Sequence, residues 1–179
     1  VREDGTLHCW GLNRRGRAAL GALPEALTPT EVPLSVRATR VSLGGAQGCI
    51  VADDESVHCW GEQVGPGVTD LDRPTPMADV RAVDVAVGLQ HICVVTPSRE
   101  ARCWGIGVNG ELGTGATPTR VDAPGEVVAL PGVDEITAGN AHTCARAGSD
   151  LYCWGFNNRG QLGAGHRATT HVPVLVRSP

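Results

Sequence analysis

Short runs rich in β-branched and small apolar residues recur along the chain in a fixed order, and turn-forming residues separate them. The first set of runs lies at 41–43, 83–87 and 133–138. The second set lies at 49–52, 91–95 and 142–146, and the third at 57–61, 101–105 and 151–155. Acidic, proline or glycine residues separate the second set from the third, at 53–55, 97–99 and 148–150. Each such pair predicts a β-hairpin, and no segment of about 11 residues or more shows helical periodicity.

An internal repeat organises these runs. The dipeptide Trp-Gly occurs at Trp10, Trp60, Trp104 and Trp154, and a cysteine precedes each tryptophan. A second shared block reads VSLGGAQGC at 41–49, VAVGLQHIC at 85–93 and ITAGNAHTC at 136–144. Units of this length with several short strands are typical of propeller blades, in which each unit packs on its neighbours. We therefore predict an all-β fold of β-propeller blades made of short antiparallel strands.

The last unit resembles a known repeat family. Residues 139–165 follow the pattern G-x-x-H-T-C-A…L-Y-C-W-G-x-N-x-x-G-Q-L-G-x-G, which is similar to the repeat of the regulator of chromosome condensation family. That resemblance implies a ring of several blades, usually seven. Here we expect three complete repeats and a partial one, with the boundaries 1–35 (truncated), 36–80, 81–130 and 131–179. The chain is then expected to be part of a larger propeller, or to be completed by another copy or another chain.

Composition narrows the possible functions. Among the 179 residues are 24 Gly and 12 Pro, which favour short elements and tight turns over long helices. All 15 basic residues are arginine and the net charge is −4, so a nucleic-acid partner is not expected. No stretch approaches the roughly 18 apolar residues of a membrane span. No basic and apolar leader opens the chain, so any export signal is expected to lie outside it. The arginine, alanine, glycine and valine bias without lysine is typical of a GC-rich bacterial source.

The seven cysteines indicate the compartment. Six of them flank predicted hairpin turns, which places the members of each pair on adjacent antiparallel strands within disulfide reach. We predict the pairs Cys49–Cys59, Cys93–Cys103 and Cys144–Cys153, and therefore an extracytoplasmic location: secreted, periplasmic or on the cell surface. Buried, reduced thiols in a cytosolic propeller are the alternative. Cys9 is expected to be unpaired by truncation, because its partner would precede Val1.

The recurring aromatic and histidine residues have structural interpretations. Each Trp is expected to pack against the next blade, and His91 and His142 to form hydrogen bonds with backbone groups. A zinc or copper site at His91, Cys93 and Cys103 would need ligands that recur, yet the residue equivalent to His91 in the preceding unit is Gln47. The segment 105–110 spells G-x-G-x-x-G, but no helix start follows it, so a dinucleotide site is not expected. We predict no catalytic residue, no metal and no cofactor.

The function that fits best is a non-catalytic extracytoplasmic scaffold that binds another protein through blade loops. The segments that differ between units are expected to form this surface, and Arg14, Arg15 and Arg159 to project outward from their turns. The segments are 22–35, 62–79, 116–130 and 164–176. Three alternatives stay open: a carbohydrate-binding or adhesion module, a propeller domain attached to an enzyme elsewhere in a longer chain, and, from the resemblance, a guanine-nucleotide exchange factor.

Overall fold

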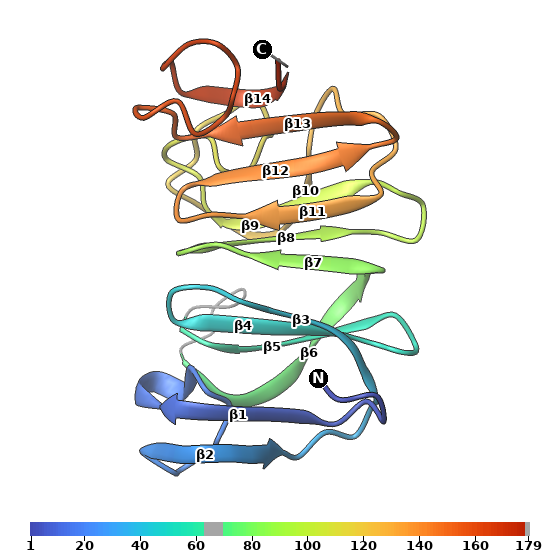
Figure 1. The fold of residues 1–179 in the computed structure, drawn as a ribbon, viewed down its shortest axis with the longest axis vertical. Coiled ribbons are helices and arrows are strands. Elements are labelled where there is room, and N and C mark those ends of the chain that lie inside the picture. The colour runs from blue at the N-terminus through green and yellow to red at the C-terminus, as the bar shows by residue number, and fades with distance from the viewer. Residues whose placement is uncertain (63–69, 178–179) are drawn as a thin grey trace.

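The computed structural model describes residues 1–62 and 70–177, which form one two-stranded and three four-stranded antiparallel sheets (Figure 1). The first sheet contains β1 (Leu7–Leu12) and β2 (Glu25–Val32), with the short 3-10 helix η1 (Arg14–Gly16) between them. The second contains β3 (Ala38–Leu43), β4 (Gln47–Ala52), β5 (Ser56–Gly61) and β6 (Leu71–Arg81). The third contains β7 (Asp84–Val87), β8 (His91–Val95), β9 (Ala101–Ile106) and β10 (Arg120–Glu126). The fourth contains β11 (Glu135–Ala138), β12 (His142–Ala147), β13 (Asp150–Gly155) and β14 (Thr170–Leu175).

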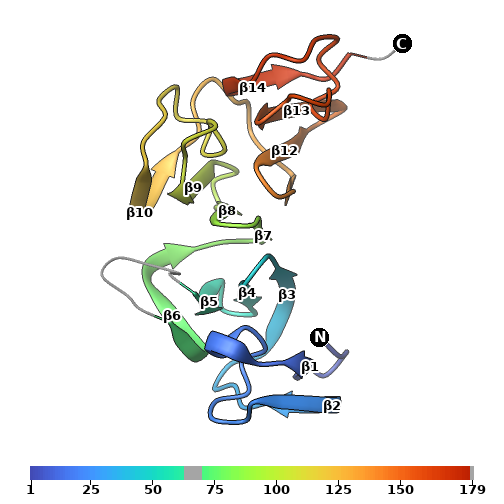
Figure 2. The same ribbon diagram turned by 90° about the vertical axis from the view of Figure 1, so that its left-hand side faces the viewer.

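The sheets follow one another as blades along an arc, with their first strands side by side (Figures 1 and 2). Hydrogen bonds join neighbouring first strands: the Ser42 hydroxyl accepts from the Val87 amide at 2.9 Å, and the Asp84 carboxylate accepts from the Ile136 amide at 3.0 Å. This radial arrangement of short antiparallel sheets is that of a propeller, so the predicted all-β fold class is confirmed.

The first three strands of each complete sheet lie where the apolar runs predict them. The turns between the second and third strands reach a left-handed backbone conformation at Glu55, Arg99 and Gly148, with φ of 67°, 66° and 61°. All six residues of β4 and all five of β8 are buried, because neighbouring blades cover both faces of their sheets. β12 alternates between buried and partly exposed residues, since a blade covers only one face of the last sheet.

The fourth strands correct the sequence analysis, which took the variable segments to be loops. β2, β6, β10 and β14 occupy much of these segments as the outer strand of each sheet. Their prolines and charges concealed them, because an edge strand exposed to solvent tolerates a missing N–H and a polar face. Residues 63–69 of the second variable segment lie outside the described residues.

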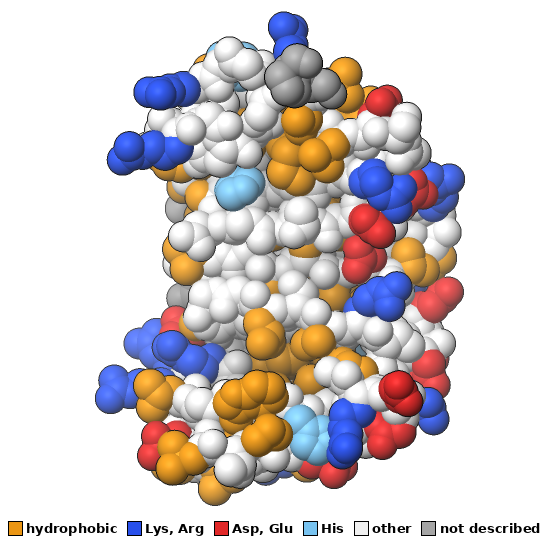
Figure 3. Space-filling view, in the orientation of Figure 1, with side chains coloured by type: hydrophobic (Ala, Val, Ile, Leu, Met, Phe, Trp, Pro, Cys, Tyr) orange, Lys and Arg blue, Asp and Glu red, His pale blue; other side chains and the backbone are white. Residues whose placement is uncertain are grey.

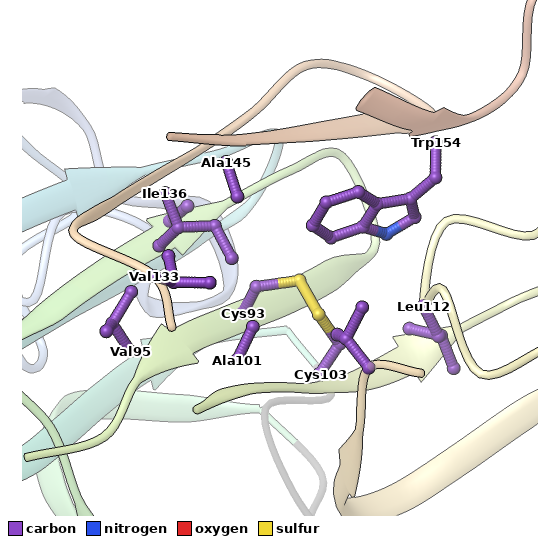
Figure 4. Close-up of a cluster of buried hydrophobic side chains, with 11 residues drawn as sticks. Cys93, Val95, Ala101, Cys103, Leu112, Val133, Ile136, Ala145 and Trp154 are labelled. Atoms are coloured by element: carbon purple, nitrogen blue, oxygen red, sulfur yellow. A yellow bond between two sulfur atoms is a disulfide. The ribbon is translucent and has the colours of Figure 1, made fainter. Parts of the chain in front are cut away.

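The blade interfaces hold the core. Between the third and fourth sheets, Trp154 lies over the Cys93–Cys103 disulfide together with Ile136 and Ala145 (Figure 4). The equivalent cluster one blade earlier contains Trp104 and the Cys49–Cys59 pair. These two interfaces therefore combine the tryptophan of one blade with the cystine of the preceding blade, and between the first two sheets Trp60 packs in a cluster with the unpaired Cys9.

The tryptophan packing was predicted in the wrong direction. The Trp60 indole N–H donates to the Arg17 carbonyl at 3.1 Å and the Trp154 indole N–H to the Glu111 carbonyl at 2.8 Å, and both acceptors lie in the preceding blade. Trp10 departs from the expected structural role: its side chain is 61% exposed, because it belongs to the first sheet and has no blade on that side.

Candidate protein interface

The ends of the strands form two opposite edges of the arc. One edge, which we call the loop edge, carries the turns between first and second strands and the longer loops between third and fourth strands (Figure 1). Its described segments are 13–24, 44–46, 88–90, 107–119, 139–141 and 156–169. The other edge, which we call the turn edge, carries the hairpin turns between second and third strands and the connections between blades. The long loops of the loop edge are held in shape by buried side chains, and the turn edge carries more carboxylates.

Two of the long loops on the loop edge are each held in shape by a buried asparagine. The Asn157 amide donates to the carbonyls of His166 and Ala168 at 2.9 and 3.0 Å, and its side-chain oxygen accepts from the Leu162 amide at 3.0 Å. Asn13 makes the equivalent three bonds in the first blade. Because one side chain satisfies three backbone groups, each loop is held in a defined shape without regular secondary structure.

The third blade lacks this asparagine, since Gly107 stands at its position. A second contact of the loop is kept: the carboxylate of buried Glu111 accepts from the Asn109 amide and side chain at 2.8 and 2.7 Å, as the Gln161 side-chain oxygen accepts from the Arg159 amide at 2.9 Å in the last blade. The sequence analysis missed these organising residues, although the Trp-Gly-x-Asn pattern at Asn13 and Asn157 was the available signal.

Arginines project from these ordered loops. Arg14, Arg17, Arg159 and Arg167 are exposed, and within the described residues none of them has a carboxylate within 4.0 Å. Arg15 alone among the loop-edge arginines is paired, with Glu62 at 3.0 Å and Asp70 at 3.8 Å. The outward projection expected for Arg14, Arg15 and Arg159 is therefore observed. Figure 3 shows basic groups along this edge at both ends of the arc.

The turn edge is richer in carboxylates, and several are bound within the fold. Asp134 forms ion pairs with Arg99 and Arg146, and the Gly148 amide donates to its carboxylate at 2.8 Å. That amide, together with the two guanidinium groups, holds the pKa of Asp134 below its ordinary value. Hydrogen bonds from Ser56 likewise lower the pKa of Asp54. Four of the five loop-edge arginines therefore have no carboxylate partner among the described residues, whereas Arg37, Arg99 and Arg146 on the turn edge are paired with carboxylates.

Disulfides join the second and third strand of each complete blade. The structure contains Cys49–Cys59, Cys93–Cys103 and Cys144–Cys153, with Cα atoms 4.1, 4.1 and 4.0 Å apart. Cys9 is a buried free thiol. The disulfide-bonded blades predicted from the spacing are therefore present.

His91 has a different partner from the one expected. Its ring is 1% exposed, and Nε2 lies 2.9 Å from the Thr143 hydroxyl in the next blade, not against a backbone group. That hydroxyl donates its single hydrogen to the Glu111 carbonyl at 3.0 Å, so it can only accept from His91, and Nε2 carries the proton. Burial, and secondarily the nearby His142, lowers the pKa of His91 to about 4. His91 is a neutral link between blades at neutral pH.

The remaining motif of the sequence, G-x-G-x-x-G, forms part of a strand and a turn. The G-x-G-x-x-G segment 105–110 runs from the end of β9 into a turn, with no helix after it. Among residues 1–62 and 70–177, no three His, Cys, Asp or Glu side chains are grouped to hold a metal ion. In the same residues, no helix has the length and apolar character to cross a bilayer.

Comparison with known proteins identifies the repeat. Two models described as the regulator of chromosome condensation (RCC1) repeat match residues 133–161 and 149–179. No curated protein matches the sequence.

Among solved structures, human WBSCR16 is similar with a TM-score of 0.91 and 23% identity, over 100% of this chain and 50% of that one. Prp20p from Saccharomyces cerevisiae, a protein described with its binding properties to Gsp1p and histones, is similar with a TM-score of 0.84 and 18% identity, over 99% of this chain and 48% of that one. Yeast RCC1 (Prp20) bound to Kap60 is similar with a TM-score of 0.83 and 18% identity, over 97% and 45%. The chain therefore spans about half the length of the structures it matches, and at these identities they show the fold alone.

Proposed function

Because this chain carries RCC1 repeats, we propose that it is a non-catalytic protein-interaction scaffold that works outside the cytoplasm and binds an acidic protein surface through its loop edge. The observation that carries the proposal is the set of unpaired arginines on loops that buried side chains hold in shape. Fixed loops on a rigid scaffold are where repeat propellers vary without disturbing their blades. Binding of Kap60, Gsp1p and histones by the similar yeast protein Prp20 is consistent with protein binding by this fold.

The charge distribution favours a partner with an acidic patch. Arginine combines a fixed charge with several donors and loses little hydration on binding, so it suits protein interfaces with carboxylates. Four such side chains extend along one edge, and none has a carboxylate partner in the part of the chain that the structure describes. A protein surface rich in Asp and Glu would satisfy them, and steering by opposite charge would speed the encounter.

The three cystines support an extracytoplasmic site of action. Disulfides persist where the environment is oxidising and are rare among reduced cytosolic proteins. A location of this kind argues against guanine-nucleotide exchange on an intracellular GTPase. The non-catalytic role rests on the structural use of the titratable groups: Glu111 organises a loop, His91 links two blades, and Asp134 anchors a turn.

Binding with charge-reversed variants tests the proposal. The loop-edge variant is Arg159→Glu/Arg167→Glu, and the matched control is Arg2→Glu/Arg37→Glu, which reverses two charges at the turn edge. Each protein is immobilised and exposed to the culture medium and envelope proteins of its source, and captured proteins are identified and then purified for titration.

A partner of the loop edge should bind the control as it binds the native protein, and the loop-edge variant roughly 10- to 100-fold more weakly. Its affinity for the native protein should also fall as salt rises, because exposed charges are screened. A partner that binds all three proteins equally would place the interface elsewhere. Binding only to glycans in the same fractions would support the carbohydrate-binding alternative.

A further inference from the structure

The open edge of β1 is where the first sheet differs from the others. In the complete blades, the cysteine of the third strand faces a cysteine on the second strand and another residue on the fourth, as Cys59 faces Cys49 and Thr75. Cys9 of β1 faces Thr30 of β2 on the fourth-strand side, and among residues 1–62 and 70–177 no strand pairs with its other side. β1 therefore has the register of a third strand without a second strand beside it.

Gly11 has the backbone conformation of a strand whose neighbour approaches closely. Its φ is 97°, similar to 92°, 106° and 102° at the equivalent Gly61, Gly105 and Gly155. At those three positions a Cβ would lie only 2.0, 2.5 and 2.7 Å from a carbonyl oxygen of the second-strand side, whereas at Gly11 it would meet nothing within 4 Å. The residue after each of the three glycines also donates its amide to that carbonyl, at 2.8 to 2.9 Å.

Apolar side chains that are buried in other blades are exposed around this edge. Trp10 is 61% exposed, against 0%, 2% and 0% for Trp60, Trp104 and Trp154. Leu43 on β3 is 61% exposed, and its equivalent Val87 in the next blade is 3% exposed. Together with Leu7, Leu12 and Val41, Trp10 and Leu43 line a hollow of about 380 Å³. Figure 3 shows hydrophobic groups gathered on this part of the surface.

The segment before β1 already turns back toward the open edge. The Arg2 amide donates to the Thr6 carbonyl at 2.9 Å, and the Gly5 amide to the Arg2 carbonyl at 3.0 Å. The hairpin turn between β8 and β9 closes with the same two bonds, from Thr96 to Glu100 and from Arg99 to Thr96. Residues 2–6 therefore have the hydrogen bonding of a turn between a second and a third strand.

The geometry points to a specific occupant: a two-stranded β-hairpin from outside residues 1–179, whose second strand pairs antiparallel with β1 and places a cysteine opposite Cys9, where a disulfide forms. Its first strand covers Val41 and Leu43 as β3 covers the first strand of the next blade. The three complete blades of the same molecule show this arrangement filled.

The covalent step is an oxidation of two thiols. The Cys9 sulfur and the hairpin cysteine sulfur become bonded, each losing its proton, and a low-molecular-weight disulfide accepts the two electrons and is reduced to two thiols. Burial raises the pKa of Cys9, which keeps the thiol protonated and slow to react until a partner strand brings a second sulfur next to it.

A second copy of the chain does not supply this occupant. Six of its cysteines are already joined within its own blades, and its remaining thiol is Cys9 itself. In an antiparallel pair of two β1 strands with Cys9 opposite Cys9, Leu12 of the second copy would lie opposite Thr6, where the Arg2 amide already binds the Thr6 carbonyl. The cysteine opposite Cys9 therefore comes from another segment.

A tethered hairpin tests the proposal, because a tether supplies the high local concentration that a short free hairpin would need. Val1 is replaced by a copy of residues 84–95, which joins the existing turn at Arg2. The copied cysteine then lies 10 residues before Cys9, the separation of the Cys93–Cys103 pair. A second fusion carries serine in place of the copied cysteine, and the native chain is the reference.

In the cysteine fusion, the free thiol of the native chain should disappear, and amide exchange in β1 should slow at least about tenfold. The serine fusion should keep one free thiol and still protect β1, since strand pairing does not depend on the disulfide. A free thiol and unchanged β1 exchange in the cysteine fusion would overturn the proposal. So would loss of protection in β8 and β12 of both fusions, because a hairpin that fits the site leaves the neighbouring blades folded. A native chain that already protects β1 and Trp10 in a dimer would show that the occupant is a second copy.

Discussion

Lowering the pH from 7 to 4 should destabilise the fold through His91. The imidazole is buried between the third and fourth blades, and its Nε2–H is donated to Thr143. In the unfolded chain it binds a proton near pH 6.5, whereas in the folded chain burial lowers its pKa to about 4. Between these values the unfolded state holds more protons, so the free energy of unfolding falls as the pH falls through this window. The loss is roughly 3 kcal/mol by pH 4, a large part of the stability of a typical domain.

Urea denaturation at pH 7, 6, 5 and 4 measures this effect in the native protein and in His91→Gln. Glutamine is a suited replacement because Gln47 stands at the equivalent position one blade earlier. The difference in unfolding free energy between the two proteins should change by roughly 3 kcal/mol between pH 7 and pH 4, in favour of the variant at low pH. His166→Gln, which removes an exposed imidazole, is the matched control. Parallel pH curves for the native protein and His91→Gln would refute the reasoning.

Three further perturbations test the packing. Cys93→Ala/Cys103→Ala should lower the free energy of unfolding by about 2–3 kcal/mol in urea titrations, since it frees a short loop in the unfolded chain, and a reductant should remove the difference from the native protein. Asn157→Ala leaves two carbonyls and one amide of its loop without their partner; we expect a loss of about 2–4 kcal/mol and faster amide exchange across 156–169, with exposed Asn158→Ala as the control. Trp154→Phe removes the bond to the preceding blade and part of the ring, and a loss of about 1–3 kcal/mol should appear as a lower Tm; an unchanged Tm would contradict the interface described.

The inner part of each blade could be predicted from sequence. Strands such as β4 and β8 are covered on both faces and read as continuous apolar runs, and the cysteines on either side of each turn mark the register. A strand buried on both faces is continuously apolar, and a disulfide within a hairpin needs two cysteines at a fixed spacing. Both features can be seen in the sequence, so the first three strands, the hairpins and the disulfide-bonded blades were predictable.

The outer strands and the direction of packing were not. Pro76 lies within β6 and Pro124 within β10, and such strands have one free edge and a solvated face, so neither periodicity nor propensity marks them. A recurring tryptophan shows that blades pack on one another but not which neighbour it contacts. The exposure of Trp10 shows that each tryptophan packs on the preceding blade: Trp10 has a following blade but no preceding one, and it is not buried. The roles of Asn13 and Asn157 also needed the structure, since the Trp-Gly-x-Asn pattern marks the two residues but not the later carbonyls and amide that their side chains bind.

Counting free thiols in the unreduced, denatured protein is the most direct test of disulfide-joined blades in an extracytoplasmic scaffold. For residues 1–179 produced alone, the structure predicts one thiol per chain, Cys9, with the other six cysteines recovered as three cystines in peptide mapping. Seven free thiols in protein isolated from its source without reductant would contradict the account.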